Sequence, residues 1–561
     1  MTANNANYVA VDEMETQFCW DIVANSFGYS IRFDGDSSEN AKPVVASMPG
    51  SQIYLGNWQA SLSCHWELES AYGFFLRDIA SEELVSSDTL ITINPGLDQG
   101  LSNLGLVLET YGSQIGGFAW ESSNETVTHV DSAGFDAFTC GGETEISITA
   151  TFNGLEYSEE FVLKVNKNAI IIVPGIMGSE LEIAETVWSL NGTLLCVKGQ
   201  TLWAESLLND YEGGVLDTVE LIDALSLLMC DSNGESIYPV IPRDNQYGAG
   251  DTYKELFLSL EEAYANNYLI EFFAYDWRLS NQTSASCLND FILDQEYDNV
   301  VLVCHSMGGL VASGYLSMGE TQRAKVESVI TLGSPLLGAP CMPYIWAEED
   351  ANMIESFLED SLPSWCGRLI NFISPIDDML GNMASIYELF PTDYYMDSIY
   401  SSRSYLSFSI YEDGELVTLD IDTYQLACDL YENHLGDYNA TLASGASDFH
   451  DSLFQGSAHI TSLVNTYYIA GCNTNTTSDI SCTYNGSSVW AQEDPEQCGD
   501  GTVPLWSATL GDYYSTKTFF ADSVDHMNLV SNDILIQFIV GLIAGDTTLP
   551  SSVVFADIPN D

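Results

Sequence analysis

A serine near the middle of the chain has the neighbours that a nucleophile on a sharp turn requires. The apolar run 300–303 leads into C-H-S-M-G-G at positions 304–309 and then into the apolar start of a helix. Small residues two positions before and after Ser306 let a strand and a helix pass closely, which leaves the serine hydroxyl exposed above a sheet. An ester carbonyl could reach the hydroxyl there. The usual pattern is G-x-S-x-G, and here Cys304 replaces the first glycine.

A serine hydroxyl is a weak nucleophile and needs a base, a carboxylate that orients the base, and donors for the oxyanion. In α/β-hydrolases the order along the chain is nucleophile, acid and histidine. The predicted acid is Asp500, because Gly499 and Gly501 permit a tight turn that can aim its carboxylate. Asp494 and Asp522 are alternatives that the spacing leaves open.

The predicted base is His526, which stands just before a predicted C-terminal helix at about 531–544. His305 precedes the nucleophile, and the turn should aim its ring away from the serine. We therefore interpret His305 as a packing or hydrogen-bonding residue. His450 and His459 fall in a predicted insertion and are weaker candidates for the base.

Donors for the oxyanion should come from the loop after an early strand and from the residue that follows the nucleophile. The loop 173–179 fits the first requirement, because Gly175 and Gly178 allow backbone amides to point into a site. The second donor would be the amide of Met307.

Apolar strand-like runs alternate with helical spacing from Asn168 onward, which predicts an α/β fold with a mostly parallel sheet and right-handed crossovers. The predicted strands are 169–173, 269–275, 300–303 and 326–332, and the predicted helix between the first two is 253–265. Stretches at about 185–245 and 340–460, rich in Trp, Tyr, Met and Leu, interrupt this alternation as insertions over the sheet. Within the second insertion, Asp413-Gly414 indicates a hairpin.

Residues before 167 are β-rich, with short alternating segments between turn residues. The segments 118–124, 127–134 and 144–151 resemble the tryptophan strand, the V-x-x-V-D-x-x-G turn and the late I-T-A strand of bacterial immunoglobulin-like domains. The chain therefore divides into a β-rich domain at 1–84, an immunoglobulin-like domain at 85–166 and a catalytic domain at 167–561. Both N-terminal domains could be spacers, and a ligand-binding role is the alternative.

Several motifs in order resemble the lecithin:cholesterol acyltransferase and lysosomal phospholipase A2 family of α/β-hydrolases. They are P-G-I-M-G-S-E-L at 174–181, Y-D-W-R at 275–278, C-H-S-M-G-G at 304–309, L-G-S-P-L-L-G-A-P at 332–340 and G-D-G-T-V-P at 499–504. The resemblance covers about 168–545. It implies an α/β-hydrolase fold in which the insertions form a membrane-touching subdomain and a lid.

The resemblance also implies roles for individual residues. Ser306, Asp500 and His526 would form the catalytic triad, and Met177 and Met307 would supply the oxyanion-hole amides. The Y-D-W-R motif would be structural, with Arg278 paired to neighbouring acids. No metal or organic cofactor is required.

Charge is the dominant feature of the composition. The chain has 14 Lys plus Arg against 81 Asp plus Glu, a formal net charge of -67. Such a field repels nucleic acid and anionic lipid surfaces, so we expect neither partner. A solvated acidic surface is the favoured interpretation, and ligation of calcium by carboxylates is the alternative. Contact with a lipid interface would be transient and restricted to neutral or zwitterionic lipid.

The 13 cysteines and several N-x-S/T sequons favour a secreted or cell-surface bacterial protein. The polar stretch 1–7 lacks the character of a signal peptide, so an exported chain would begin here after cleavage. No apolar run reaches the length of a transmembrane span. Cys196 with Cys230, Cys341 with Cys366, and Cys472 with Cys482 could form disulfides, while Cys304 should be an unpaired thiol.

The leading functional hypothesis is a serine carboxylic ester hydrolase of the lipase, phospholipase or esterase type, which acts on an ester or lipid through an acyl-enzyme. One alternative is an acyltransferase that passes the acyl group to an alcohol. Another is a surface binding protein with an inactive hydrolase domain. Apolar residues of the first insertion, from Trp188 to Met229, could line an acyl site, although the core of a cap is the favoured interpretation.

Overall fold

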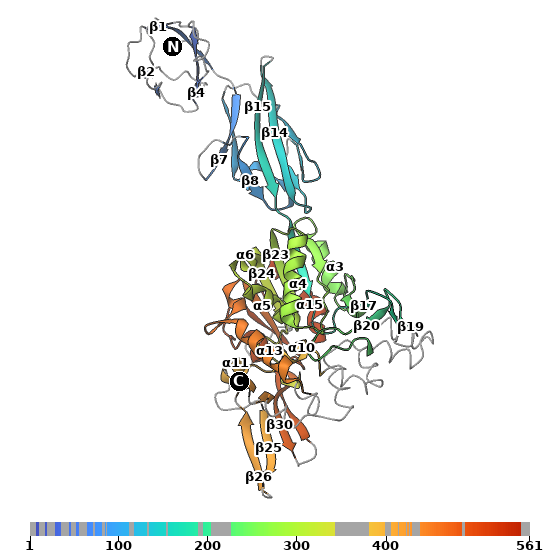
Figure 1. The fold of residues 1–561 in the computed structure, drawn as a ribbon. Helices are drawn as coiled ribbons and strands as arrows, with labels where there is room; N and C mark the ends of the chain where they lie inside the picture. Colours follow the sequence, from blue (N-terminus) through green and yellow to red (C-terminus); the bar gives the residue numbers. More distant parts are fainter. Residues whose placement is uncertain are drawn as a thin grey trace. The chain divides into compact units, whose positions relative to one another are not determined.

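A computed structural model describes the chain in separate ranges. They are 7–9, 17–19, 29–34, 44–46, 52–54, 64–70, 73–80, 85, 87–111, 117–131, 134–152, 155–188, 194–203, 226–342, 381–398, 406–412, 415–421, 423–425, 427–428, 438–484 and 489–550. The chain divides into two compact units, Met1–Asn168 and Ala169–Asp561, which are distinguished by colour in Figure 1.

The described part of the first unit consists of strands and one short 3-10 helix. Its sheets are β1 (Asn7–Val9), β6 (Cys64–Ser70), β3 (Tyr29–Asp34) and β4 (Val44–Ala46); β2 (Gln17–Cys19) and β5 (Gln52–Tyr54); β10 (Leu106–Tyr111) and β7 (Gly73–Asp78); β11 (Ala119–Ser122), β14 (Gly142–Phe152), β15 (Leu155–Val165) and β8 (Leu90–Ile93); and β12 (Thr128–Val130), β13 (Phe135–Ala137) and β9 (Gly96–Gln99). The 3-10 helix is η1 (Leu101–Leu104). The β-rich character expected here is confirmed, and the immunoglobulin-like relationship stays a prediction.

Strand β7 packs with the strands that follow it in sequence. It pairs antiparallel with β10, from Gly73 opposite Tyr111 to Asp78 opposite Leu106. Its Phe74 and Leu76 are buried in one core together with apolar residues of β13, β14 and β15. Residues from both sides of the predicted boundary at 84 thus share a core.

The second unit contains one large sheet in the order β22 (Leu269–Phe272), β16 (Asn168–Val173), β23 (Asn299–His305), β24 (Val326–Leu332), β29 (Thr466–Cys472) and β32 (Thr518–Asp522). The pairs β16–β22, β23–β24, β24–β29 and β29–β32 are all parallel. Every residue of β16 and of β29 is buried, as expected of strands covered on both faces. The predicted α/β class is confirmed.

Helices cover both faces of this sheet (Figure 1). On one face, α3 (Lys254–Tyr264) and α15 (Asp533–Ile543) share a core with one alternating set of strand residues, including Ile172 and Val303. On the other face, α4 (Asn281–Asp294) and α5 (Gly308–Ser317) pack against the opposite set, including Val173 and Leu302. The predicted helices 253–265 and 531–544 are confirmed. The predicted strand 269–275 is shorter, because β22 ends at Phe272 before the Y-D-W-R segment turns away.

The remaining elements are short. The helices are α6 (Glu320–Lys325), α10 (Ala384–Tyr387), α11 (Asp393–Ser398), α13 (Ala440–Ser452) and α14 (Leu505–Thr509), with the 3-10 helices η2 (Ala249–Asp251), η4 (Ile460–Leu463) and η5 (Met527–Val530). Among the described helices, none combines the length and the hydrophobicity that a bilayer span requires.

The two predicted insertions are described only in part. The first includes β18 (Val187–Trp188), β19 (Leu194–Cys196) and a sheet of β20 (Thr201–Trp203), β17 (Leu181–Ile183) and β21 (Val240–Pro242). Leu202, Trp203, Leu227 and Leu228 are buried in the main core, as the interpretation of a cap core requires, whereas Trp188 is 60% exposed. The remaining part of this insertion lies outside the described residues.

The second insertion contains the predicted hairpin. Strands β25 (Leu406–Glu412) and β26 (Glu415–Ile421) pair antiparallel and flank the Asp-Gly dipeptide, so the hairpin is confirmed. They join β30 (Thr474–Tyr484) and β31 (Val489–Gly499) in one sheet, and β27 (Phe454–Gln455) pairs with β28 (Ala458–His459). Most of 340–380 lies outside the described residues.

Two of the three suggested disulfides are not formed in the structure. Cys196, Cys230 and Cys472 are thiols, so neither the 196–230 nor the 472–482 disulfide is formed. Cys304 is a fully buried thiol in β23, as expected. Cys366, suggested as the partner of Cys341, lies outside the described residues.

Candidate active site

Ser306 lies on the turn between β23 and α5, in a backbone conformation with a φ of 51°. Its amide donates a hydrogen bond to the carbonyl of Leu332 at the end of the neighbouring strand, 2.9 Å away. A Cβ added to Gly308 would lie 2.2 Å from the carbonyl oxygen of Val173, so only glycine lets the helix start this close to β16. The strained, closely packed turn that the motif predicts is therefore present.

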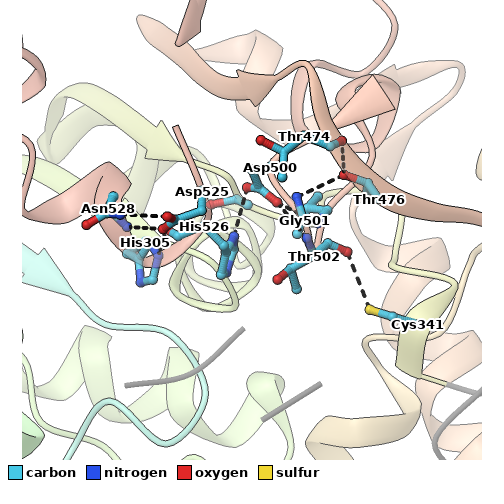
Figure 2. Close-up of polar contacts among 12 residues, drawn as sticks. His305, Cys341, Thr474, Thr476, Asp500, Gly501, Thr502, Asp525, His526 and Asn528 are labelled. Carbon is cyan, nitrogen blue, oxygen red and sulfur yellow. Dashed lines mark hydrogen bonds and ion pairs between the residues drawn. The ribbon is translucent and has the colours of Figure 1, made fainter. Parts of the chain in front are cut away.

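Asp500 and His526 are in direct contact, although 26 positions separate them in the chain. Asp500 Oδ2 accepts a hydrogen bond from His526 Nδ1 at 2.8 Å, and both side chains are almost fully buried (Figure 2). The other carboxylate oxygen, Oδ1, accepts from the amides of Thr502 at 3.0 Å and Val503 at 2.7 Å. The carboxylate is thus oriented by its own tight loop, as the glycines around it predicted.

The backbone of His526 is fixed as well as its ring. Its amide donates to the carbonyl of Asp500 at 2.9 Å, so the acid and the histidine are joined at two points. After it, Asn528 donates to both carboxylate oxygens of Asp525, which closes the turn (Figure 2). Gly333 lies close beneath the pair, since a Cβ there would be 2.6 Å from Asp500 Oδ2.

The loop of Asp500 is also anchored to β30, which pairs with strand β25 of the second insertion. The amide of Gly501 donates to Thr476 Oγ1 at 2.8 Å, and the hydroxyl of Thr476 donates to the carbonyl of Thr474 (Figure 2). The carbonyl of Thr502 accepts a hydrogen bond from Cys341 Sγ. Contacts from two distant segments therefore hold the loop that carries Asp500.

The loop after β16 lies against Ser306. A Cβ added to Gly175 would be 2.8 Å from Ser306 Cβ and 3.3 Å from Ser306 Oγ. Met177 has a φ of 60°, a backbone conformation that residues other than glycine rarely adopt. Among the described residues, no hydrogen bond engages the amide of Met177 or of Met307, so both stay available to a ligand.

Aromatic side chains hold this loop in place. Tyr275 Oη donates to the carbonyl of Pro174 at 2.8 Å, and Trp203 Nε1 donates to the carbonyl of Met177 at 3.0 Å. The amide of Gly175 donates to Tyr253 Oη at 3.0 Å, so this amide points away from the site rather than into it. Sequence reasoning missed Tyr253 and Trp203, because hydrogen bonds between distant segments leave no local pattern.

His305 is a buried hydrogen-bonding residue, as expected. Its Nδ1 lies 3.0 Å from Tyr253 Oη, and its Nε2 lies 3.2 Å from the carbonyl oxygen of His526. Burial, reinforced by the nearby ring of His526, holds the pKa of His305 well below its usual range. His305 is therefore a neutral imidazole at physiological pH.

The alternative acids and bases have other partners. Asp522 accepts from Asn473 Nδ2 at 2.7 Å. His450 Nε2 donates to the carbonyl of Glu388, and burial lowers the pKa of His450 to about 4. His459 Nδ1 contacts the hydroxyl of Thr461, and burial lowers its pKa to about 3. The side chain of Asp494 lies outside the described residues.

Arg278 of the Y-D-W-R motif is completely buried and paired with Asp276. Its Nε and Nη2 donate to the two carboxylate oxygens at 2.8 and 2.6 Å, and Nη1 donates to the carbonyl of Leu228 at 2.7 Å. The predicted pairing of Arg278 with an acid is confirmed. This arginine ties the motif to the first insertion, since Leu228 belongs to that insertion.

The described residues include no group of three or more His, Cys, Asp or Glu side chains arranged to hold a metal ion. Among the described residues, the hydroxyl of Ser306 makes no hydrogen bond to the ring of His526. Ser306 follows β23 and His526 follows β32, and β24 and β29 lie between these two strands in the sheet. Hydrogen bonds between a nucleophile and its base are often long before substrate binds. The described groups are thus a serine on a strained turn, a histidine bonded to a carboxylate, and two backbone amides that no described hydrogen bond engages.

Residues 244–354 match the lecithin:cholesterol acyltransferase family model. The match includes Ser306 and the Y-D-W-R motif but ends before Asp500 and His526. A search of curated proteins gave no match.

Solved structures resemble the chain at low sequence identity. A chain of the Tle4–Tli4 complex is 14% identical, with 68% of this chain and 99% of that chain covered and a TM-score of 0.38. A putative aryl esterase from Burkholderia cenocepacia is 9% identical, with 58% and 85% covered and a TM-score of 0.18. The family match at 244–354 is thus the more specific finding.

Proposed function

We propose that the chain is a serine carboxylic ester hydrolase that acts on an ester or lipid through the triad Ser306, Asp500 and His526. The observation that carries this proposal is the 2.8 Å hydrogen bond from His526 to the buried Asp500, beside a serine on a strained strand-to-helix turn. A buried carboxylate, a histidine and a serine on a strand-to-helix turn are the parts that nucleophilic acyl transfer requires. The family match at 244–354 agrees with chemistry on acyl esters.

In this mechanism His526 Nε2 takes the proton of Ser306 as the hydroxyl oxygen attacks the ester carbonyl. Asp500 holds the ring in the tautomer that leaves Nε2 free to accept, and stabilises the imidazolium that forms. The tetrahedral intermediate collapses, His526 returns the proton to the leaving alcohol, and an acyl-serine remains. Water activated by His526 then releases the acid and restores the serine.

The amides of Met177 and Met307 are the proposed donors to the oxyanion. Both amides lack another partner among the described residues, and the loop of Met177 touches Ser306 through Gly175. One such donor is typically worth about 3–4 kcal/mol in the transition state. The hydrogen bonds from Tyr275 and Trp203 keep this loop in one conformation before substrate arrives.

Acyl transfer to an alcohol is the second candidate, and the family description favours it. The two reactions share the acyl-enzyme and differ in the acceptor. We further propose a secreted or cell-surface location, transient contact with neutral or zwitterionic lipid, and an immunoglobulin-like fold for 85–166. The exposed Trp188 is a side chain that could make the lipid contact.

The test compares the wild type with Ser306→Ala on p-nitrophenyl esters of short and long acyl chains. We expect turnover in the wild type and a loss of about 10⁶-fold in kcat in the variant, because the proposed mechanism forms the acyl-enzyme on the Ser306 oxygen. Thermal unfolding of both proteins controls for folding. Acyl products formed with and without an added alcohol separate transfer from hydrolysis.

Turnover that survives in Ser306→Ala would overturn the triad. A folded wild type without any ester turnover would instead favour a binding protein with an inactive hydrolase domain.

A further inference from the structure

A continuous chain of hydrogen bonds links the oxyanion loop to the base without passing through the nucleophile. It runs from the amide of Gly175 to Tyr253 Oη over 3.0 Å, from Tyr253 Oη to His305 Nδ1 over 3.0 Å, and from His305 Nε2 to the carbonyl of His526 over 3.2 Å. Tyr253 and His305 are almost fully buried. All links are therefore shielded from competing water.

The two ends of this chain determine where every proton lies. A backbone amide can only donate, so Tyr253 Oη accepts from Gly175. A backbone carbonyl can only accept, so Nε2 of His305 carries the proton that reaches His526. The neutral ring then has a lone pair on Nδ1, and the hydroxyl of Tyr253 donates into it. Every donor in the chain is matched by an acceptor.

We propose that Tyr253 and His305 form a positioning pair. The pair fixes the position of the oxyanion loop relative to the backbone of the base His526. This inference rests on the proposed function. Neither residue touches the reacting atoms in the mechanism above. Their contribution is to keep the oxyanion donors and the base at the distance and angle that the transition state requires.

The pair works only while His305 is uncharged. A proton on Nδ1 would leave the hydroxyl of Tyr253 without its acceptor in a buried place. It would also put a cation beside the ring of His526, whose centroid is 4.9 Å from that of His305. The titratable groups that face His305 in the described structure are Tyr253 and His526. Burial keeps the pKa of His305 low and that of Tyr253 high, so both stay neutral.

The test uses the full chain with Tyr253→Phe, His305→Gln and the double variant. Tyr253→Phe keeps the ring and removes both hydroxyl bonds, and His305→Gln keeps a donor near Nε2 but removes the acceptor at Nδ1. For each single variant we expect kcat on a short p-nitrophenyl ester to fall about 10-fold, with KM within about twofold of wild type. The double variant should lose clearly less than the product of the two single losses, because the residues act through one chain.

Tyr264→Phe is the matched control. Tyr253 precedes helix α3 and Tyr264 is the last residue of that helix. The hydroxyl of Tyr264 donates a hydrogen bond to the carbonyl of Val540, so the substitution removes a tyrosine hydrogen bond away from the site. It should leave kcat unchanged. Wild-type kcat in both single variants, or fully multiplicative losses in the double variant, would overturn the pair.

A second measurement tests the positioning pair even if the proposed ester hydrolysis is not found. If the wild type lacks turnover that depends on Ser306, the pair is tested by NMR of the chain labelled with 15N-histidine, with His305 assigned through its loss in His305→Gln. A neutral ring protonated on Nε2 between about pH 5 and pH 8, whose signal moves in Tyr253→Phe, supports the pair. A ring that titrates in this window overturns it.

Discussion

At the scale of single residues, several positions of the site have a positive φ, a backbone conformation that residues other than glycine rarely adopt. Met177, Ser306 and Ser523 have φ values of 60°, 51° and 57°. Met177 is a proposed oxyanion donor, Ser306 is the proposed nucleophile, and Ser523 lies three positions before the proposed base His526. Such conformations cost about 1–3 kcal/mol each and persist only where the surrounding structure over-determines them. Here the surrounding structure supplies close backbone packing and buried hydrogen bonds. The positions that allow this packing are glycines.

Gly333→Ala should therefore damage the site more than the fold. Gly333 has a φ of 56°, and an added Cβ would be 2.6 Å from Asp500 Oδ2 and 3.1 Å from His526 Nδ1. The added methyl group would push the Asp500 carboxylate and the His526 ring out of their present positions. A displacement of this kind can cost about 100-fold in kcat. Kinetics on a p-nitrophenyl ester measure the loss. Gly445→Ala is the control, since a Cβ on this helical glycine meets nothing within 4 Å; equal kcat in both variants would contradict the prediction.

At the scale of elements, the parallel sheet brings the site together. The ends of β16, β23 and β24 lie at one edge, because parallel strands all run in the same direction. The loop of Met177, the turn of Ser306 and Gly333 follow these strands directly. The end of β32 adds the segment of His526, and β29 separates β24 from β32.

The second insertion is joined to α4 by a buried acid. Glu388 accepts from the hydroxyl of Ser280 and from the amide of Asn281, both at 2.6 Å, at the start of this helix. Burial, partly offset by these bonds, raises the pKa of Glu388 to about 7. A carboxyl whose pKa is raised by folding stabilises the fold below its unfolded pKa, and this contribution is lost as the pH rises through the folded value.

The free energy of unfolding should therefore fall between about pH 4.5 and pH 7 in the wild type, by up to about 3 kcal/mol from this group. Glu388→Gln should remove this part of the pH dependence, because glutamine does not ionise. Urea unfolding at several pH values measures the difference. The exposed Glu261→Gln on α3 is the control and should follow the wild type. A pH dependence that Glu388→Gln leaves intact would contradict the assignment.

Much of this arrangement could be predicted from the sequence, and the reasons are local. The small residues around Ser306 require a sharp turn, the glycines around Asp500 require a tight loop, and the apolar run at 169–173 requires a strand buried on both faces. The hydrogen bonds of Tyr253 and His305 could not be predicted, because they depend on which residues of distant segments come into contact. The hydrogen bond from the Gly175 amide to Tyr253 could not be predicted either, for the same reason.

At the scale of the whole molecule, the charge of -67 dominates interactions at long range. Added salt should increase binding to anionic vesicles, because it screens the repulsion between like charges. Co-sedimentation with vesicles of anionic lipid, measured from about 10 to 500 mM salt, tests this. Vesicles of zwitterionic lipid are the control and should show little dependence on salt. Binding to anionic vesicles that falls steeply with salt would mean that a local basic patch overrides the net charge.

The same charge bears on the last step of ester hydrolysis in the proposed mechanism. Attack by Ser306 separates charge within the site without changing its total, so the surrounding field has little net effect on that step. The released acid is different, because it ionises to a carboxylate in a molecule with far more acids than bases. None of the side chains assigned to the triad or to the oxyanion donors is a lysine or arginine that could retain it. Inhibition by the product acid should accordingly be weak, and the enzyme should keep its rate as free acid accumulates.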